Sequence, residues 1–353
     1  AGEFGAGFQN PEGYKGCGDF PTIKVTTDWK EVDVTTTCNG DNAKRLLLNI
    51  GKYPGTLYID DFEVYYTKSS NTIPLTDEEK KEVLTPVLQK WIYGMMEATE
   101  GKVKAWDVVN EAISGKEGSE FYPLQSATRG TVSADDAKNN FYWQDYLGDI
   151  DYVRTAVAAA RKGFADAGGN PEELKLFIND YNLETAYDQN KKLKSLIHWI
   201  EEWEKDGVTK IDGIGSQMHV TCSMDPAKQK ENEEAYVNML NLMVGSHKLV
   251  RISELDMGLE DKNGNLVNTT DMTEEEHKAM RAYYEFIVKK YLEIVPENQQ
   301  WGICQWCATD SPANSGWRAG LPVGLWDLDY YRKHTYGGFA AGLGAPEYWN
   351  DAK

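Results

Sequence analysis

Positive charge is scarce in this chain. Its 353 residues include 37 Lys and Arg against 56 Asp and Glu, which gives a formal net charge of −19. A surface so acidic repels phosphate backbones and anionic lipid headgroups, so the composition argues against nucleic acid as a partner. A neutral partner suits this charge better.

Long apolar runs are also missing. None reaches the length that crosses a bilayer, which argues against a membrane-spanning segment. The first residues, Ala1-Gly2-Glu3-Phe4, lack the charged and apolar regions of a secretory leader. They are typical of a cut end, so this end of the chain does not indicate a localisation.

Cysteine is sparse, with five residues in the chain. Cys304 and Cys307 form a CxxC pair on an apolar stretch, but zinc needs four ligands and no second pair lies at a suitable spacing. No metal site is therefore predicted there, and buried free thiols are the simpler interpretation. Cys17 and Cys38 could form a disulfide if the protein resides in an oxidising compartment, and the sequence does not decide this.

The first 67 residues are predicted to be β-structure. Apolar and polar residues alternate over 22–26, 46–50 and, more loosely, 57–65, with turn residues between these segments. Short strands at this spacing favour a sandwich, although four or five strands are few for a closed one. Residues 68–74 are a polar linker, and the pattern changes over residues 75–353.

This second region opens with a predicted helix. Thr76 and Glu79 form a capping box, and apolar residues then recur at helical spacing from Val83 to Met95. Pro86 is expected to kink this helix or restart it. Strands are predicted at 103–109, 174–178, 211–218, 249–253 and 301–306, with helices at 152–167, 186–206, 228–244 and 273–291. The alternation predicts a parallel α/β sheet.

Polar or aromatic side chains follow every one of these strands. Asn110 and Glu111 end the first strand, and Glu254 and Asp256 end the fourth. The remaining tips carry Asn179, Asp180, Tyr181 and Asn182; Gln217 and His219; and Trp301, Gln305 and Trp306. Polar groups at the carboxyl ends of parallel strands are typical of the active site of a (β/α)8 barrel. Two carboxylates on separate strands suit acid/base and nucleophilic chemistry.

The strand-end motifs resemble those of glycoside hydrolase family 10, the retaining endo-β-1,4-xylanases. Trp106–Ala112 is similar to the family's acid/base strand, and Ile252–Asp256 is similar to its nucleophile strand. Further motifs match in the same order: Leu176–Asn182, Gly213–His219, Trp301-Gly302 and Trp317-Arg318. The resemblance implies a (β/α)8 barrel, of which this chain holds strands four to eight. It also implies hydrolysis of xylan and xylo-oligosaccharides without a cofactor.

The same resemblance implies roles for individual residues. Glu111 would be the general acid/base, and Glu254 the nucleophile that forms a covalent glycosyl-enzyme. Asn110 would bind the 2-hydroxyl of the sugar, and Asp256 would orient His219 against Glu254. The cleft would also be lined by Asn179, Tyr181, Asn182, Gln217, Trp301 and Trp317.

The chain departs from the family pattern in three ways. Gln305 stands where the last motif usually has Asp, and an insertion near 308–316 separates Trp301 from Trp317. The family's first three strands have no counterpart. Residues 1–67 instead resemble the later strands of a family 4/9-type carbohydrate-binding sandwich, which some Bacteroidetes xylanases insert after the third strand.

We therefore expect this chain to be the C-terminal part of a longer enzyme, whose N-terminal fragment completes both barrel and sandwich. Asp60 is a candidate ligand for a structural Ca²⁺ in the sandwich, with an ordinary turn residue as the alternative. A retaining β-glucanase and a non-catalytic polysaccharide-binding fragment are the competing interpretations. A polymeric substrate implies a secreted, periplasmic or cell-surface enzyme.

Overall fold

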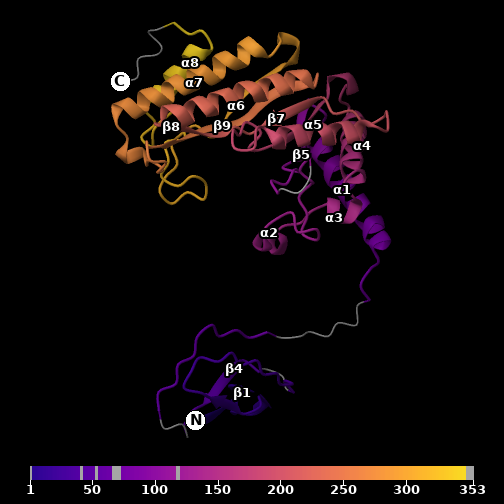
Figure 1. The fold of residues 1–353 in the computed structure, drawn as a ribbon. Helices are drawn as coiled ribbons and strands as arrows, with labels where there is room; N and C mark the ends of the chain where they lie inside the picture. Colours follow the sequence, from indigo (N-terminus) through magenta and orange to yellow (C-terminus); the bar gives the residue numbers. More distant parts are fainter. Residues whose placement is uncertain (1, 40–42, 52–54, 66–72, 117–119, 347–353) are drawn as a thin grey trace. The chain divides into compact units, whose positions relative to one another are not determined.

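A computed structural model describes residues 2–39, 43–51, 55–65, 73–116 and 120–346 of the chain. The chain forms two compact units, Ala1–Ile73 and Pro74–Lys353 (Figure 1). A search of the described residues finds no helical segment whose length and hydropathy would let it span a bilayer.

The first unit is a small antiparallel sheet. β1 (Gly2–Gln9) is the central strand and pairs with β2 (Gly16–Asp19), β3 (Ile23–Val25) and β4 (Arg45–Asn49). β3 and β4 confirm two of the predicted strands.

The strand predicted over 57–65 is wrong, because these residues form no strand in the structure. Tyr58, Phe62 and Tyr65 in this segment are exposed. An alternating pattern forms a strand only where its apolar face has something to cover, and here these side chains cover nothing.

The cysteines of this unit are free thiols. Cys17 is buried on β2 and Cys38 is exposed, so the disulfide that the sequence left open is not formed. The CxxC pair, Cys304 and Cys307, is also free and exposed, which corrects the expectation of buried thiols there.

The second unit is built on a parallel sheet. Its strands are β5 (Ala105–Asn110), β6 (Lys175–Asp180), β7 (Gly213–Ser216), β9 (Leu249–Glu260) and β10 (Gln300–Gln305), in that spatial order, and β8 (His219–Ser223) also pairs with β9. Every pairing is parallel, which confirms the predicted sheet. The carboxyl ends of the strands therefore lie along one edge.

Helices link these strands and cover one face of the sheet. The long ones are α1 (Asp77–Ala98), α4 (Asp151–Asp166), α5 (Lys191–Glu204), α6 (Pro226–Gly245) and α7 (Glu274–Ile294). Shorter ones are α2 (Ala134–Asn139), α3 (Gln144–Leu147) and α8 (His334–Gly342). Figure 1 shows α6 and α7 lying along β8 and β9. Trp203, Tyr236, Tyr284 and Phe164 are among the largest fully buried side chains of the core between them.

β7 and β8 are two parts of one path beside β9. Ser216 lies opposite Ile252, and His219 lies opposite Asp256. The two pairs are therefore three residues apart on the β7–β8 side and four residues apart on β9. Met218, between the two parts, has a left-handed backbone with φ of 60°. The break lets the sheet continue with its register moved by one residue.

α1 confirms the predicted capping box, with the Thr76 side chain and the Glu79 side chain each accepting the other's backbone N–H. The helix continues through Pro86 without a break. Leu88 is buried, whereas Trp91 is 68% exposed. Exposed apolar side chains recur every four residues along α1: Val83, Val87, Trp91 and Met95. They therefore form a stripe on one side of the helix.

Candidate active site

Glu111 stands directly after β5 in a turn that holds its backbone tightly. Its φ is 56°, a left-handed conformation that costs a residue with a side chain about 1 kcal/mol or more. Its N–H donates to the Asn179 carbonyl at 2.8 Å, and its carbonyl accepts from Gln125 Nε2 at 2.7 Å. These two bonds keep a strained turn in one conformation.

The Glu111 carboxylate is oriented by two amide side chains. Gln217 Nε2 donates to Glu111 Oε1 at 2.8 Å, and Asn110 Nδ2 approaches the same oxygen at 3.3 Å. Gln217 is buried, whereas Asn110 and Glu111 are exposed. The carboxylate is thus accessible and yet fixed from behind.

Glu254 lies on β9 and is held by a third amide, that of Asn179. Asn179 Nδ2 donates to Glu254 Oε1 at 3.0 Å and to Asn110 Oδ1 at 2.9 Å. Ser253 Oγ donates to Asn179 Oδ1 at 2.6 Å, so the Asn179 amide is held on its acceptor side as well. One buried amide therefore connects the Glu254 carboxylate to the residue beside Glu111.

His219 and Asp256 lie behind Glu254. His219 Nε2 is 3.4 Å from Glu254 Oε2, and its Nδ1 is 3.2 Å from Asp256 Oδ2. Asp256 is fully buried and accepts from Trp317 Nε1 at 2.7 Å. Arg318 Nη1 lies 3.3 Å from Asp256 Oδ1. The imidazole thus lies between two carboxylates, with Nδ1 toward the buried Asp256 and Nε2 toward Glu254.

This arrangement presents two carboxylates from separate strands, each held by neutral amide donors. Such a pair is able to act as nucleophile and as general acid on one bound molecule. Because side-chain amides do not ionise near neutral pH, they orient Glu111 and Glu254 without acting as acid or base.

Most of the predicted site residues come together here. Asn110, Gln217, His219, Asn179 and Trp317 all contact either a carboxylate or a neighbour of one, as do Glu111, Glu254 and Asp256 themselves. Tyr181 and Asn182 follow β6 in the next loop, where burial raises the pKa of Tyr181 to about 12.

Trp301 is a predicted residue that the structure keeps apart from this group. It lies at the start of β10, where Gly302 is opposite Arg251, and its ring packs against Phe177 at 5.5 Å. That level is three residues before Glu254, or roughly 10 Å along a strand. A tryptophan at the amino end of a parallel strand cannot share a site with groups at the carboxyl ends.

Two further residues belong to the site. The ring of Trp306, after β10, stands edge-on to His219 at 6.2 Å. Arg318 donates to the carbonyls of Val220 and His219, each at 2.7 Å. Both positions were visible in the sequence, Trp306 as a strand end and Arg318 beside Trp317, but their contacts depend on the loop that follows β10.

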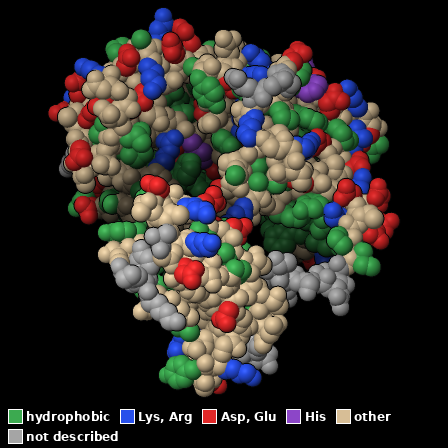
Figure 2. Space-filling view, turned by 60° about the horizontal axis from the view of Figure 1, so that its bottom comes forward, with side chains coloured by type: hydrophobic (Ala, Val, Ile, Leu, Met, Phe, Trp, Pro, Cys, Tyr) green, Lys and Arg blue, Asp and Glu red, His purple; other side chains and the backbone are tan. Residues whose placement is uncertain are grey.

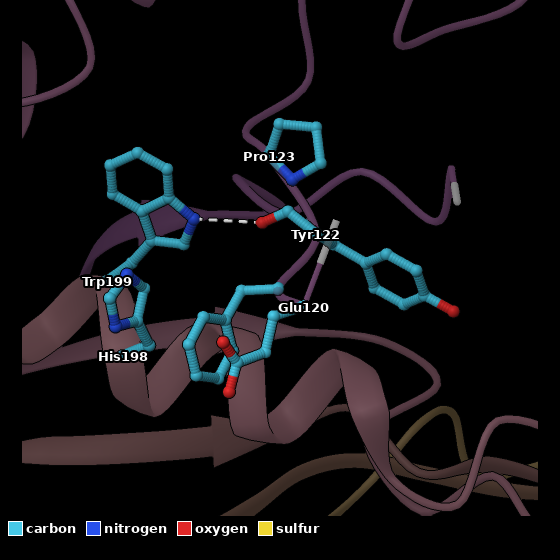
Figure 3. A pocket seen from close by; sticks show the side chains of 6 residues that line it. Glu120, Tyr122, Pro123, His198 and Trp199 are labelled. Carbon is cyan, nitrogen blue, oxygen red and sulfur yellow. Dashed lines mark hydrogen bonds between the residues drawn. The ribbon is translucent and has the colours of Figure 1, made fainter. Parts of the chain in front are cut away.

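A separate hollow of about 270 Å³ lies where the loop after β5 meets α5. Phe121 stacks on His198 with ring centroids 4.1 Å apart, and Trp199 Nε1 donates to the Tyr122 carbonyl at 2.9 Å (Figure 3). Tyr122 N–H donates to Ser195 Oγ at 2.8 Å. These contacts fasten the loop to the helix.

Asp60, the candidate Ca²⁺ ligand, is exposed and accepts the N–H of Asp61. The described residues contain no group of three or more His, Cys, Asp or Glu side chains arranged to hold a metal. Ca²⁺ takes six to eight oxygen ligands, so a Ca²⁺ at Asp60 would need further oxygen ligands beside it, and the site stays a prediction.

Comparison with known proteins places the second unit in one family. A family model described as glycosyl hydrolase family 10 matches residues 64–341. The chain is 29% identical over 259 residues to endo-1,4-beta-xylanase A of Thermotoga maritima, across 72% of this chain and 20% of that protein. It is 35% identical over 178 residues to endo-1,4-beta-xylanase 2 of Claviceps purpurea, across 50% of this chain and 43% of that one.

Solved structures show the same fold. The structure of GH10 from Paenibacillus barcinonensis matches with a TM-score of 0.57 at 24% identity, over 77% of this chain and 70% of that one. The fold is that of part of a (β/α)8 barrel, and the chain spans less than half the length of the two relatives named above. Because the family model covers most of the 353 residues, the chain belongs to glycosyl hydrolase family 10.

Proposed function

We propose that this protein is a retaining endo-β-1,4-xylanase and that Glu111 and Glu254 are its catalytic residues. The observation that supports this is the pair of strand-end carboxylates joined through Asn179, Asn110 and Gln217. Relatives in the same family are named endo-1,4-beta-xylanase. Xylan is a neutral polymer in its backbone, which is compatible with a net charge of −19.

Hydrolysis would take place in two displacements. Glu254 attacks the anomeric carbon and forms a covalent glycosyl-enzyme, while Glu111 donates a proton to the departing glycosidic oxygen. Glu111 then removes a proton from the water that attacks the same carbon, which releases Glu254 and regenerates the acid.

The surrounding residues keep each carboxylate in its role. Asn179 holds one oxygen of Glu254, and His219, oriented by Asp256, faces the other. Asn110 lies between the two carboxylates and is exposed, so its amide is available to the 2-hydroxyl of a bound sugar. That contact strengthens as the oxocarbenium ion develops.

The test is a comparison of three Glu→Gln variants on xylan. Glu254→Gln is expected to abolish release of reducing sugar, and Glu111→Gln to lower it by roughly 10²–10⁴-fold. Glu260→Gln is the control, because Glu260 ends the same strand and pairs with Lys228. If Glu254→Gln kept the wild-type rate, the nucleophile assignment would be wrong.

Substrate choice is tested on the same preparations. Faster release from xylan than from carboxymethylcellulose is expected for a xylanase, whereas the reverse order would indicate a β-glucanase. Absence of turnover on an aryl xylobioside, with retained binding of xylan, would indicate a non-catalytic binding protein.

We further propose that a separate segment with the remaining strands closes the barrel. Within the described residues, β5 pairs with β6 alone and β10 pairs with β9 alone, which leaves two open sheet edges. The exposed stripe on α1 adds an uncovered apolar surface, and Figure 2 shows green hydrophobic side chains reaching the surface in several places. Open edges and apolar stripes of this kind are usually covered in a folded protein.

Native mass spectrometry of active material tests this closure. A second polypeptide or a longer chain is expected in any sample that hydrolyses xylan. An active species of 39.8 kDa with no partner would contradict it.

For residues 1–67 we propose the later strands of a carbohydrate-binding sandwich, supported by the four-stranded antiparallel sheet and exposed aromatic side chains such as Trp29. Because the proposed substrate is a polymer, the enzyme would work outside the cytosol, as a secreted, periplasmic or cell-surface protein.

A further inference from the structure

We propose that Asp180, together with its ion partner Lys192, is a positioning residue for Glu111. The inference rests on the proposed role of Glu111 as the general acid/base. Asp180 touches neither carboxylate; it acts through the backbone of the turn that carries Glu111.

Asp180 ends β6 and is fully buried. Its Oδ2 accepts the N–H of Ile113 at 3.0 Å, and its Oδ1 accepts the N–H of Tyr181 at 2.9 Å. Lys192 Nζ lies 2.8 Å from Oδ1. One carboxylate therefore joins three segments: the turn after β5, the end of β6 and the first turn of α5.

Lys192 is as deeply buried as its partner. It is 2% exposed, and its ammonium lies 3.3 Å from the centroid of the Tyr181 ring. Burial raises the pKa of the Asp180 carboxyl, while Lys192 and the two N–H groups act in the opposite direction. A buried ion pair is a poor source of stability, because desolvation offsets most of its attraction. Its best-attested use is to fix one arrangement of the chain.

The turn between β5 and Ile113 needs such a restraint. Glu111 has a left-handed backbone and is the most exposed part of the turn, whereas Ile113 is fully buried. The Asn179 carbonyl holds the N–H of Glu111, and Asp180, the next residue, holds the N–H of Ile113. Two consecutive residues of β6 thus clamp both sides of the turn.

α5 makes the clamp rigid. Besides carrying Lys192, it binds the later part of the same loop. Ser195 Oγ accepts the Tyr122 N–H, and Trp199 Nε1 donates to the Tyr122 carbonyl (Figure 3). Gln125, a little further on, donates to the Glu111 carbonyl. A shift of the turn of about 1 Å would displace the acid relative to the leaving oxygen, and errors of that size cost up to roughly 100-fold in rate.

Asp180→Asn is the informative substitution, because it keeps the volume of the side chain. An amide has one acceptor oxygen. The Lys192 ammonium beside Oδ1 favours that oxygen on its own side, so the Ile113 N–H on the other side would face an NH₂ group. The substitution also leaves the Lys192 ammonium without an anion. The double variant Asp180→Asn/Lys192→Met removes that unpaired charge and serves if the single variant does not fold.

The leaving group separates a positioning role from a purely structural one. A dinitrophenyl xylobioside loses an acidic phenol that departs without a proton, whereas xylan and a phenyl xylobioside need the proton from Glu111. A displaced Glu111 slows formation of the glycosyl-enzyme from the second class alone, whereas hydrolysis of that intermediate, in which Glu111 acts as base, is common to both classes. Loss of folded protein slows both classes by the same factor.

Asp212→Asn is the matched control. Asp212 Oδ2 accepts the N–H of Leu176 at 2.9 Å and lies 2.8 Å from Arg161 Nη2. Like Asp180, Asp212 thus accepts a backbone N–H and pairs with a cationic side chain. It does so at the amino ends of β6 and β7, away from the site.

Both Asp180 variants are expected to lower kcat on the phenyl substrate by roughly 10–100-fold with little change in KM, and to leave the first step on the dinitrophenyl substrate nearly unchanged. Asp212→Asn is expected to affect both substrates equally. Equal losses in the first step on both substrates for the Asp180 variants would overturn the proposal.

Amide hydrogen exchange gives a readout that does not depend on activity. The Ile113 amide is expected to exchange at least about 10-fold faster in Asp180→Asn than in Asp212→Asn, since an amide deprived of its acceptor opens more readily. Unchanged exchange would overturn the proposal by itself. Faster exchange in a protein that hydrolyses neither substrate would instead count against the function assigned to Glu111.

Discussion

The phenol of Tyr291 offers a prediction whose size follows from three contacts. Its Oη donates to the Val250 carbonyl at 2.8 Å and accepts the N–H groups of Trp301 and Gly302 at 3.0 and 2.9 Å. A phenol has one donor and two acceptor positions, so all three are used. Tyr291 therefore fastens the start of β10 to β9 and α7.

Tyr291→Phe would leave three backbone groups without this partner. A buried polar group that loses its partner costs about 1–3 kcal/mol. Trp301 is 40% exposed, so water is able to reach its N–H, and the cost then comes mainly from the other two groups. We expect the free energy of unfolding of the second unit to fall by about 2–4 kcal/mol.

Tyr236→Phe is the control for this measurement. Tyr236 is equally buried, but its Oη makes one bond, to the Ile287 carbonyl at 2.9 Å. Its loss should cost about 1 kcal/mol. Urea unfolding followed by tryptophan fluorescence compares the two variants. If Tyr291→Phe proved no more costly than Tyr236→Phe, the bonds at the start of β10 would not be stabilising.

Two further predictions concern other surfaces of the second unit. Burial lowers the pKa of His277, whose ring stacks on His334 with centroids 5.6 Å apart. The folded state therefore binds a proton here less readily than the unfolded state, whose His titrates near pH 6.5. The folding stability that is present above pH 6.5 is lost as the pH falls below this value. His277→Phe should therefore reduce the drop in Tm between pH 8 and pH 5; an unchanged drop would refute this. Trp91→Glu should alter the chain's own unfolding free energy by less than about 0.5 kcal/mol but prevent association with the proposed closing segment; a large loss in the chain alone would show that Trp91 is already packed.

The strands of the second unit were predictable because buried parallel strands are continuous apolar runs. The sequence predicted β9 only as far as Ser253, whereas it extends to Glu260. The extension contains Leu255, Met257 and Leu259, which alternate with other residues and are buried beside β8. β8 itself was not predicted, because the left-handed turn at Met218 leaves no mark in a pattern of apolar residues.

Which helix face is covered and which side chains reach the site depended on contacts between distant parts of the chain. The exposed stripe on α1 has the same helical periodicity as the apolar side chains that α1 buries, such as Leu88. The sequence therefore could not show which apolar side chains of this helix are covered. The residues at the tips of β5, β6, β7 and β9 were identified by motif. Trp301 was grouped with them because Trp301-Gly302 resembles part of the same final motif as Trp317-Arg318. The structure instead places Trp301 at the start of β10, at the amino end of the strand. The hydrogen bond from the Ile113 N–H to Asp180, on which the proposed restraint of Glu111 rests, was invisible, since these two residues are 67 positions apart.

The register change at Met218 has a consequence for how related chains should be aligned. Side chains of a strand alternate between its two faces, so a single deletion in residues 216–219 would exchange inward and outward positions from His219 onward. In most loops a one-residue gap is tolerated, but here it would turn the imidazole away from Glu254. Related chains with a one-residue gap at this place are therefore expected to be inactive, even when they retain every carboxylate of the site.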